Sequence, residues 1–177
     1  MACAFALGFG SLGGSAAPVE HNFDVYLKLD GIEGDSTVRG YEKWIALSSV
    51  QFGIANDVVS RTTTAGGGIA AGRITPSPIV ITKSADAATV PLFIAAASGK
   101  HIPKGTIAFV RPGQPPATVL SYELANVLIS SYSAGNGYET IELYYDSIVI
   151  GYASQKPDGS LNTPVKGGWN FALNKKL

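Results

Sequence analysis

The fold depends most on residues 117–153, ATVLSYELANVLISSYSAGNGYETIELYYDSIVIGYA. Apolar and polar residues alternate on both sides of the glycine-containing turn at residues 133–137, a pattern typical of two β-strands joined in a hairpin. Each strand changes the phase of its alternation once. The apolar positions on the two sides of the change are Leu120, Tyr122 and Leu124 against Val127 and Ile129 in the first strand, and Ile141, Leu143 and Tyr145 against Ile148 and Ile150 in the second.

The two phase changes lie almost opposite each other when the hairpin is folded about Gly135. One is near Ala125-Asn126 and the other near Tyr145-Asp146. Because the side-chain period of a strand is two, a change of phase moves the buried side chains to the other face of the sheet. Paired strands that change face together carry a bulge or bend, as in a sheet that curls into a barrel or passes between two packed layers.

Further strands are expected over residues 22–30, 44–54, 79–82 and 106–110. One helix of roughly 8–11 residues is expected between them, with Thr89 as its cap, Pro91 in its first turn and Gly99 after its end. We therefore expect a mainly β protein. Its form is a small β-barrel or two packed antiparallel sheets, with one short α-helix and a long extended loop.

The long loop occupies residues 55–78, ANDVVSRTTTAGGGIAAGRITPSP, which we call the arm. It has no sustained hydrophobic period, and loops longer than about 12–15 residues inside a compact domain are usually functional or disordered. An arm that contacts a partner has this composition, and so does a flexible linker. The candidate inter-subunit residues of the arm are Arg61, Thr62, Thr63, Thr64, Gly66, Gly67, Gly68, Gly72 and Arg73.

Composition favours one domain with a weakly charged surface. The chain has 177 residues, of which 46% are hydrophobic and 15% charged, and its 13 basic and 13 acidic side chains cancel. A hydrophobic core is therefore expected, whereas a surface for nucleic acid or an anionic membrane is not. A neutral surface also does little to oppose self-association.

The N-terminus is treated separately as an extension of unclear role, residues 1–21, before one β domain, residues 22–177. The extension is small and apolar like the end of a secretory signal, but no Lys or Arg precedes Lys28. A signal, a misassigned start and an ordered extension all remain open. The single cysteine, Cys3, allows neither an intrachain disulfide nor a zinc site.

No constellation of residues predicts catalysis, a cofactor or a metal. The chain lacks a phosphate loop, a dinucleotide-binding fingerprint and a nucleophile elbow. The chain has two histidines, His21 and His101; for His101, which follows the end of the expected helix, we favour a structural role.

Two groups of polar residues remain as weaker candidates. One is an acidic turn without the spacing of an EF-hand calcium loop. The other is a set of tyrosines suited to a carbohydrate platform, although strand aromatics usually pack into cores or interfaces. These groups are Asp30, Glu33 and Asp35, and Tyr144, Tyr145 and Tyr152.

Seven stretches of the sequence form an ordered set. They are YLKLDGIEGDS (26–36), SSVQFGI (48–54) after Trp44-Ile45, SRTTTAGGGIAAGRITPSPIVITK (60–83), ATVPLFIAAASGKHI (88–102), the strand at 122–133, ETIELYYDSI (139–148) and GGWNF (167–171). Together they resemble the Hcp family, the tube-forming protein of bacterial type VI secretion systems, over about residues 22–173. The first twenty residues have no counterpart in the usual short start of the family, and Asn170 stands where an acidic residue is common.

The resemblance implies a structural subunit rather than an enzyme. Such subunits form homo-hexameric rings, and the rings stack into a hollow tube that carries secreted effectors or a spike and is driven out by a contracting sheath. The protein is then expected in the bacterial cytoplasm and, after secretion, outside the cell. In this arrangement Arg61 and Arg73 anchor the arm to carboxylates or carbonyls of the adjacent subunit; ordinary solvated arginines are the alternative.

A second hypothesis is a secreted monomeric β-sandwich that binds a glycan or small ligand through its loops and exposed tyrosines. A small hydrolase would need a nucleophile–base pair, for which the sequence offers no candidate. A tail tube of a related contractile injection system shares the same subunit design and is not separated from a secretion tube by sequence.

Overall fold

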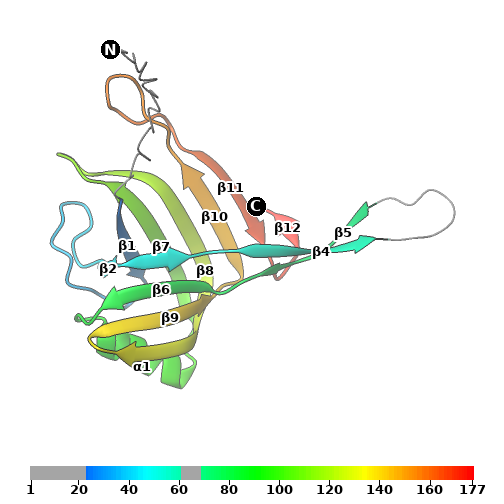
Figure 1. Cartoon of the computed structure of the whole chain (residues 1–177), viewed down its shortest axis with the longest axis horizontal. Helices are drawn as coiled ribbons and strands as arrows, with labels where there is room; N and C mark the ends of the chain where they lie inside the picture. The colour runs from blue at the N-terminus through cyan, green and yellow to red at the C-terminus, as the bar shows by residue number, and fades with distance from the viewer. Residues whose placement is uncertain (1–22, 61–68) are drawn as a thin grey trace, which may run out of the picture.

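The structure, a computed structural model, describes residues 23–60 and 69–177 (Figure 1). Within these residues the chain is mainly strand, with one short helix. The strands are β1 (Asp24–Leu29), β2 (Ile45–Leu47), β3 (Ser49–Gln51), β4 (Ile54–Ser60), β5 (Ile69–Pro76), β6 (Ile79–Ser84), β7 (Ile102–Arg111), β8 (Ala117–Gly135), β9 (Tyr138–Tyr144), β10 (Ser147–Tyr152), β11 (Val165–Asn170) and β12 (Lys175–Lys176), and the helix is α1 (Thr89–Ser98).

The body of the molecule consists of two antiparallel sheets that share β8. The wide sheet has the order β2-β1-β7-β8-β10-β11-β12, and the narrow sheet has the order β3-β6-β9-β8. In Figure 1 the strands β6 and β9 lie across one end of the wide sheet, next to α1. The expected mainly β fold with packed antiparallel sheets and one helix is confirmed, and the sheets do not close into a barrel.

The phase change predicted in the long hairpin is the place where β8 passes from one sheet to the other. The strand pairs with β10 as far as Ala125, opposite Ser147, and with β9 from Leu128, opposite Tyr144. Between these two ladders Asn126 has a φ of 53°. This left-handed conformation is one that asparagine tolerates better than most residues, and it turns the strand at the junction.

The side chain of Asn126 also fastens the bend. Its Nδ2 donates to Oδ2 of Asp146 at 2.5 Å, and its Oδ1 lies 2.9 Å from Nδ1 of His101. The N–H of Asp146 donates to the carbonyl of Ala125 at 3.0 Å, so the breaks in the two strands of the hairpin are bonded to each other. This contact gives His101 the structural role expected from the sequence.

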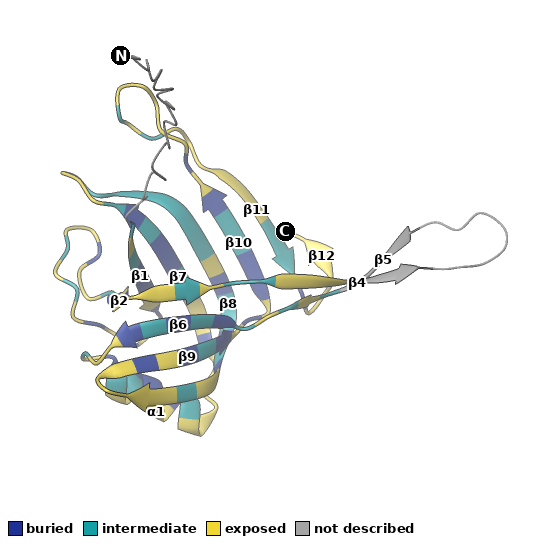
Figure 2. Ribbon diagram, in the orientation of Figure 1, coloured by how far each residue is buried: buried dark blue, intermediate teal, exposed yellow. Residues whose placement is uncertain are grey.

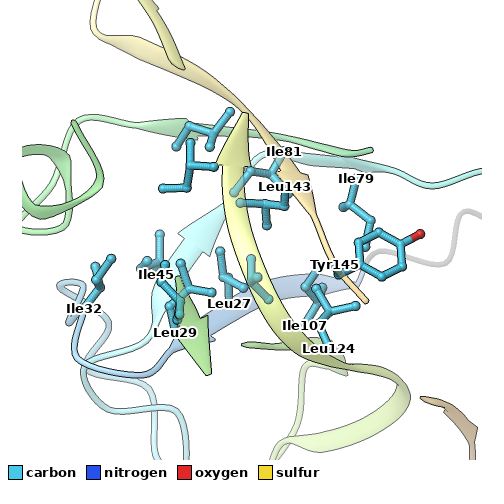
Figure 3. Packing of buried hydrophobic residues seen from close by; sticks show 14 of the residues in the cluster. Leu27, Leu29, Ile32, Ile45, Ile79, Ile81, Ile107, Leu124, Leu143 and Tyr145 are labelled. Carbon is cyan, nitrogen blue, oxygen red and sulfur yellow. The ribbon is translucent and has the colours of Figure 1, made fainter. Parts of the chain in front are cut away.

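The hydrophobic core lies between the two sheets (Figures 2 and 3). Its members are the inward-facing residues of both sheets together with the inner side of α1. Figure 3 shows side chains from β1, β2, β6, β7 and β9 meeting in this space. Those without exposed surface include Leu27, Ile45, Ile79, Ile81, Leu92, Ile107, Ile141 and Leu143.

The single strand expected over residues 44–54 is wrong in detail, because the chain changes sheets within it. β2 pairs with β1 in the wide sheet, and β3 pairs with β6 in the narrow sheet. Ser48 lies between them and donates its N–H to the carbonyl of Thr82 at 2.7 Å. Before the crossing, Ile45 and Leu47 face the main core, whereas Trp44 packs against a second apolar cluster.

The helix has the expected length, but its expected cap is wrong. Thr89 is its first helical residue, and the N-cap residue, Ala88, makes no side-chain capping bond. Asp86 bonds the turn before the helix: its Oδ1 accepts from the N–H of Ala88 at 2.9 Å, and its N–H donates to Oγ1 of Thr89 at 3.1 Å. Gly99 ends the helix as expected, with a φ of 62° and its N–H directed at the carbonyls of Ala95 and Ala96.

Replacement of Asn126 tests the bend in β8. N126A adds left-handed strain of about 1–2 kcal/mol to the loss of the bonds to Asp146 and His101, whereas N126G loses only the bonds. We expect urea denaturation at equal protomer concentration to show N126A as the less stable variant by about 1 kcal/mol. Equal stabilities would mean that the backbone conformation of residue 126 carries no strain.

Candidate functional site

The arm is a two-stranded antiparallel ribbon rather than the irregular loop expected from its composition. β4 pairs with β5 from Ile54, opposite Pro76, to Ser60, opposite Ile69, with a register shift between Asn56 and Val58. In Figure 1 the ribbon points away from both sheets. Of the predicted contact residues, Gly72 and Arg73 lie in β5; Arg61, Thr62, Thr63, Thr64, Gly66, Gly67 and Gly68 lie outside the described residues.

The arm root, residues 52–56 and 74–77, is fixed to the body by ring packing and hydrogen bonds. The ring of Phe52 lies 5.5 Å from the ring of Tyr122 on β8. Burial raises the pKa of Tyr145 to about 12, so its hydroxyl stays protonated and donates to the carbonyl of Ser77 at 3.3 Å. The N–H of Ser77 donates to the carbonyl of Gly53 at 3.0 Å. The ribbon therefore leaves the body from a defined base.

An apolar groove of about 260 Å³ lies between the arm root and the strands β10 and β11. It contains no charged side chain. Figure 1 shows the arm root crossing in front of these strands, so the groove is the part of the wide sheet that the narrow sheet does not cover. The residues that line the groove are Phe52, Ile54, Ile74, Ile148, Ile150, Gly167, Gly168, Trp169 and Phe171.

The outer side of α1 is a second apolar surface. The helix has large apolar residues on both sides: Leu92 is buried against the core, whereas Val90, Phe93 and Ile94 are more than half exposed. A helix that is hydrophobic all round is normally covered on all sides. The exposed side of α1 is thus a candidate contact surface in an assembly.

A buried ion cluster joins α1 to the narrow sheet. Nζ of Lys83 on β6 lies 2.7 Å from Oε2 of Glu139 on β9 and 2.8 Å from Oδ1 of Asp86, and it donates to Oγ1 of Thr89 at 3.4 Å. Lys83 has no exposed surface, and Glu139 is 2% exposed. A buried ammonium group of this kind is tolerated only when it is paired with carboxylates.

The cluster keeps Glu139 ionised at neutral pH. Burial by itself raises the pKa of this carboxyl, but the hydrogen bonds from Lys83, Thr89 and Tyr132 and the charge of Lys83 outweigh burial. The resulting pKa of Glu139 lies below its ordinary value of 4.5. Burial, with the carboxylate of Glu139 nearby, raises the pKa of Tyr132, so its hydroxyl stays protonated.

The acidic turn that the sequence offered as a weaker candidate does not form a shared site. Glu33 pairs with the exposed Lys43 at 3.0 Å, and Asp35 accepts from the N–H of Ala87 at 3.1 Å, so both carboxylates serve local contacts. No group of three potential metal ligands occurs in the described part of the chain.

The three tyrosines do not form a platform. Tyr145 is buried in the core, whereas Tyr144 and Tyr152 are about half exposed at the ends of different strands. His21 lies outside the described residues.

Lys83, Glu139 and Trp169 are not among the residues expected from the sequence. A signal for the first two was present: Lys83 continues the apolar phase of Ile79 and Ile81, and Glu139 has the same phase as Ile141. Opposite charges at core positions of two strands indicate a buried pair when the strands are neighbours, and that pairing was not predicted. Trp169 gave no signal beyond its place in the last strand.

Comparison with known proteins identifies the family. The family described as "Type VI secretion system effector, Hcp" matches residues 26–152, from β1 to the end of β10. The protein Hcp1 of Pseudomonas aeruginosa is 31% identical in an alignment of 110 residues that covers 58% of this chain and 68% of that protein. Among the described residues there is no helix long and apolar enough to cross a membrane.

Solved structures match the whole body. A structure of a type six secretion system protein aligns with a TM-score of 0.80 at 28% identity and covers 88% of this chain and 100% of its own. The crystal structure of Hcp1 from Salmonella typhimurium aligns with a TM-score of 0.69 at 25% identity, over 88% of this chain and 99% of its own.

Removal of Lys83 tests the ion cluster. K83M leaves two carboxylates near the core without a cation, and we expect it to lower the free energy of unfolding by about 3–5 kcal/mol. The double variant K83M/E139L replaces the pair by apolar side chains and should recover most of this loss. The control K43M breaks an exposed pair and should change stability by less than about 1 kcal/mol. Urea denaturation distinguishes these outcomes; a K83M variant as stable as wild type contradicts the cluster.

Glu139 makes stability pH-dependent. The unfolded chain protonates this carboxyl near pH 4.5 and the folded chain only at lower pH, so the unfolded state binds more protons as the pH falls. Its contribution is present above pH 4.5 and is lost as the pH falls through the folded pKa. We expect the difference in unfolding free energy between wild type and E139Q to narrow between pH 7 and pH 3. A constant difference would show that Glu139 does not titrate in this window.

Proposed function

The chain belongs to the Hcp family of type VI secretion system proteins and is a subunit of a secretion tube, and from this premise we propose that it forms homo-hexameric rings that stack into a hollow tube. The Hcp family consists of structural tube proteins rather than enzymes, so we assign no reaction to the chain. We also propose that residues 22–177 act as one domain and that residues 1–21 extend outside it.

The observation that supports assembly is the arm. A closed ring of identical subunits in head-to-tail order needs two different surfaces on each subunit. The ribbon of β4 and β5 starts from a base held by Phe52 and Tyr145 and points away from both sheets. A pre-formed projection loses little conformational entropy on contact with a neighbour. Stacking of one ring on the next is a task suited to it.

The predicted role of the arm residues remains part of this proposal. Arg61 and Arg73 stand on either side of the triple glycine and offer planar guanidinium groups for carboxylates or carbonyls of the adjacent subunit. Thr62, Thr63 and Thr64 add hydroxyl groups on the same segment. Gly66, Gly67, Gly68 and Gly72 allow close backbone approach.

The further partners follow from the tube. We propose that the lumen holds secreted effectors, that a spike caps the tube and that a sheath surrounds it. The subunit is made in the bacterial cytoplasm and leaves the cell when the sheath contracts. Neither nucleic acid nor a membrane is a proposed partner, because the chain carries no net charge to attract an anionic surface.

Light scattering on the purified chain, with negative-stain images of the same fractions, tests the ring. We expect six subunits with a central hole, or stacks of such rings. A monomer at micromolar protomer concentration would contradict the ring and would favour a binding module instead.

Deletion of residues 62–72 tests the arm. It leaves the root pairs from Ile54, opposite Pro76, to Asn56, opposite Ile74, in place. We therefore expect a folded, hexameric variant whose tubes in negative-stain images are much shorter than those of wild type. In a control variant, residues 62–68 are replaced by glycine and serine at equal length. This control keeps the length of the arm but removes its side chains, so it shows whether tube length depends on side-chain contacts or on the length of the arm. Long tubes formed by the deletion variant would show that the arm does not join rings.

A further inference from the structure

The inner face of the wide sheet is apolar beyond the region covered by the narrow sheet. Directly opposed residues of antiparallel strands share a face, and Ile148, Ile150 and Tyr152 on β10 stand opposite Trp169, Gly167 and Val165 on β11. The stripe begins in the core next to the arm root and ends at Tyr152 and Val165, which are 53% and 77% exposed. Figure 2 shows β11 changing from intermediate to exposed along this stripe. The apolar groove is its middle section.

Trp169, which lines the groove, also carries a buried hydrogen-bond donor without a partner. Trp169 Nε1 is buried, and in the described part of the chain it is the buried side-chain nitrogen or oxygen that has no hydrogen-bond partner. An unpaired donor of this kind destabilises the isolated subunit, because water cannot reach it freely.

Gly167 opens the groove without a reason inside the subunit. It lies in the middle of β11, its φ is not in the left-handed region, and a Cβ added to it would meet no heavy atom within 4 Å. Neighbouring Gly168 differs, since a Cβ there would lie 2.8 Å from the carbonyl oxygen of Ile148. In the apolar groove, the missing side chain at Gly167 leaves room for another backbone to approach closely.

We propose that this groove receives an extended segment of a second copy of this chain, whose backbone passes over Gly167. The proposal rests on the proposed function, because ring formation brings a second copy to this face. The groove has no charged side chain, so it selects an apolar, neutral segment rather than a charged ligand.

The size of the groove also favours a second copy over a separate ligand. A specific protein interface buries about 800 Å² on each partner, and a groove of about 260 Å³ holds only a few side chains. A separate short peptide held here alone would bind weakly. A second copy is held in addition by the arm root and by the exposed end of the stripe, which continue the groove on both sides.

The test fills the groove from within. G167V projects its side chain from β11 over Ile150, and G135V makes the same change at a strand glycine far from the groove that also has no neighbour within 4 Å. We expect both variants to unfold in urea at the wild-type midpoint as monomers. Sedimentation velocity across protomer concentrations should show G135V assembling like wild type, and G167V needing roughly tenfold or more protomer to assemble.

A second readout covers the case in which G167V does not fold. In a W44F background Trp169 is the remaining tryptophan, and its fluorescence should shift when monomers assemble. If G167V assembles at the same protomer concentration as wild type, or if Trp169 emission does not change on assembly, the groove is not a contact between copies. The proposed ring is unaffected by either result. A monomeric wild type overturns the proposed function itself.

Discussion

The structure depends on one strand serving two sheets. β8 pairs with β10 before the bend at Asn126 and with β9 after it. The left-handed backbone conformation of Asn126 and its side-chain bond to Asp146 therefore hold the turn between the wide and the narrow sheet. β9 and β10 are consecutive in the chain and pair with the two halves of β8, so on this side the chain passes from one sheet to the other along paired strands. On the other side the chain crosses between the sheets at Ser48, which lies between β2 and β3. Two short crossings therefore replace the full closure of a barrel.

This arrangement leaves the two sheets unequal in size. The wide sheet continues past β8 into β10, β11 and β12, and the narrow sheet ends at β8. A sheet with an apolar inner face needs cover, and among residues 23–60 and 69–177 the arm root supplies it beyond this point. The arm and the apolar groove are consequently two results of one feature: the chain that leaves the narrow sheet at Gln51 covers part of the overhang before it becomes a projection.

The sequence predicted what periodicity alone can reveal. The paired phase changes near Asn126 and Asp146 located the bend, because a strand with one buried face must shift its pattern when that face changes. The ribbon in the arm was not predictable in this way, since an exposed two-stranded ribbon has no core to impose alternation. The buried pair of Lys83 and Glu139 was not predicted for a related reason. Their phase was visible, but a charged residue in the core phase is interpreted as exposed until its partner strand is known. Strand pairing was the missing information.

The overhang reflects the opposed demands on a tube subunit. Each copy must fold before it assembles, so its core is closed by strands and fastened to α1 by an ion cluster that contributes more to a unique geometry than to net stability. Assembly then needs surface that the single subunit leaves uncovered. Apolar surface is available for this contact, but apolar contacts are non-directional and by themselves do little to select the correct partner. A neutral chain with open apolar faces risks disordered aggregation. Recessing this area in a groove beside Gly167 limits access to an extended backbone. Shape thus provides the selectivity that charge does not.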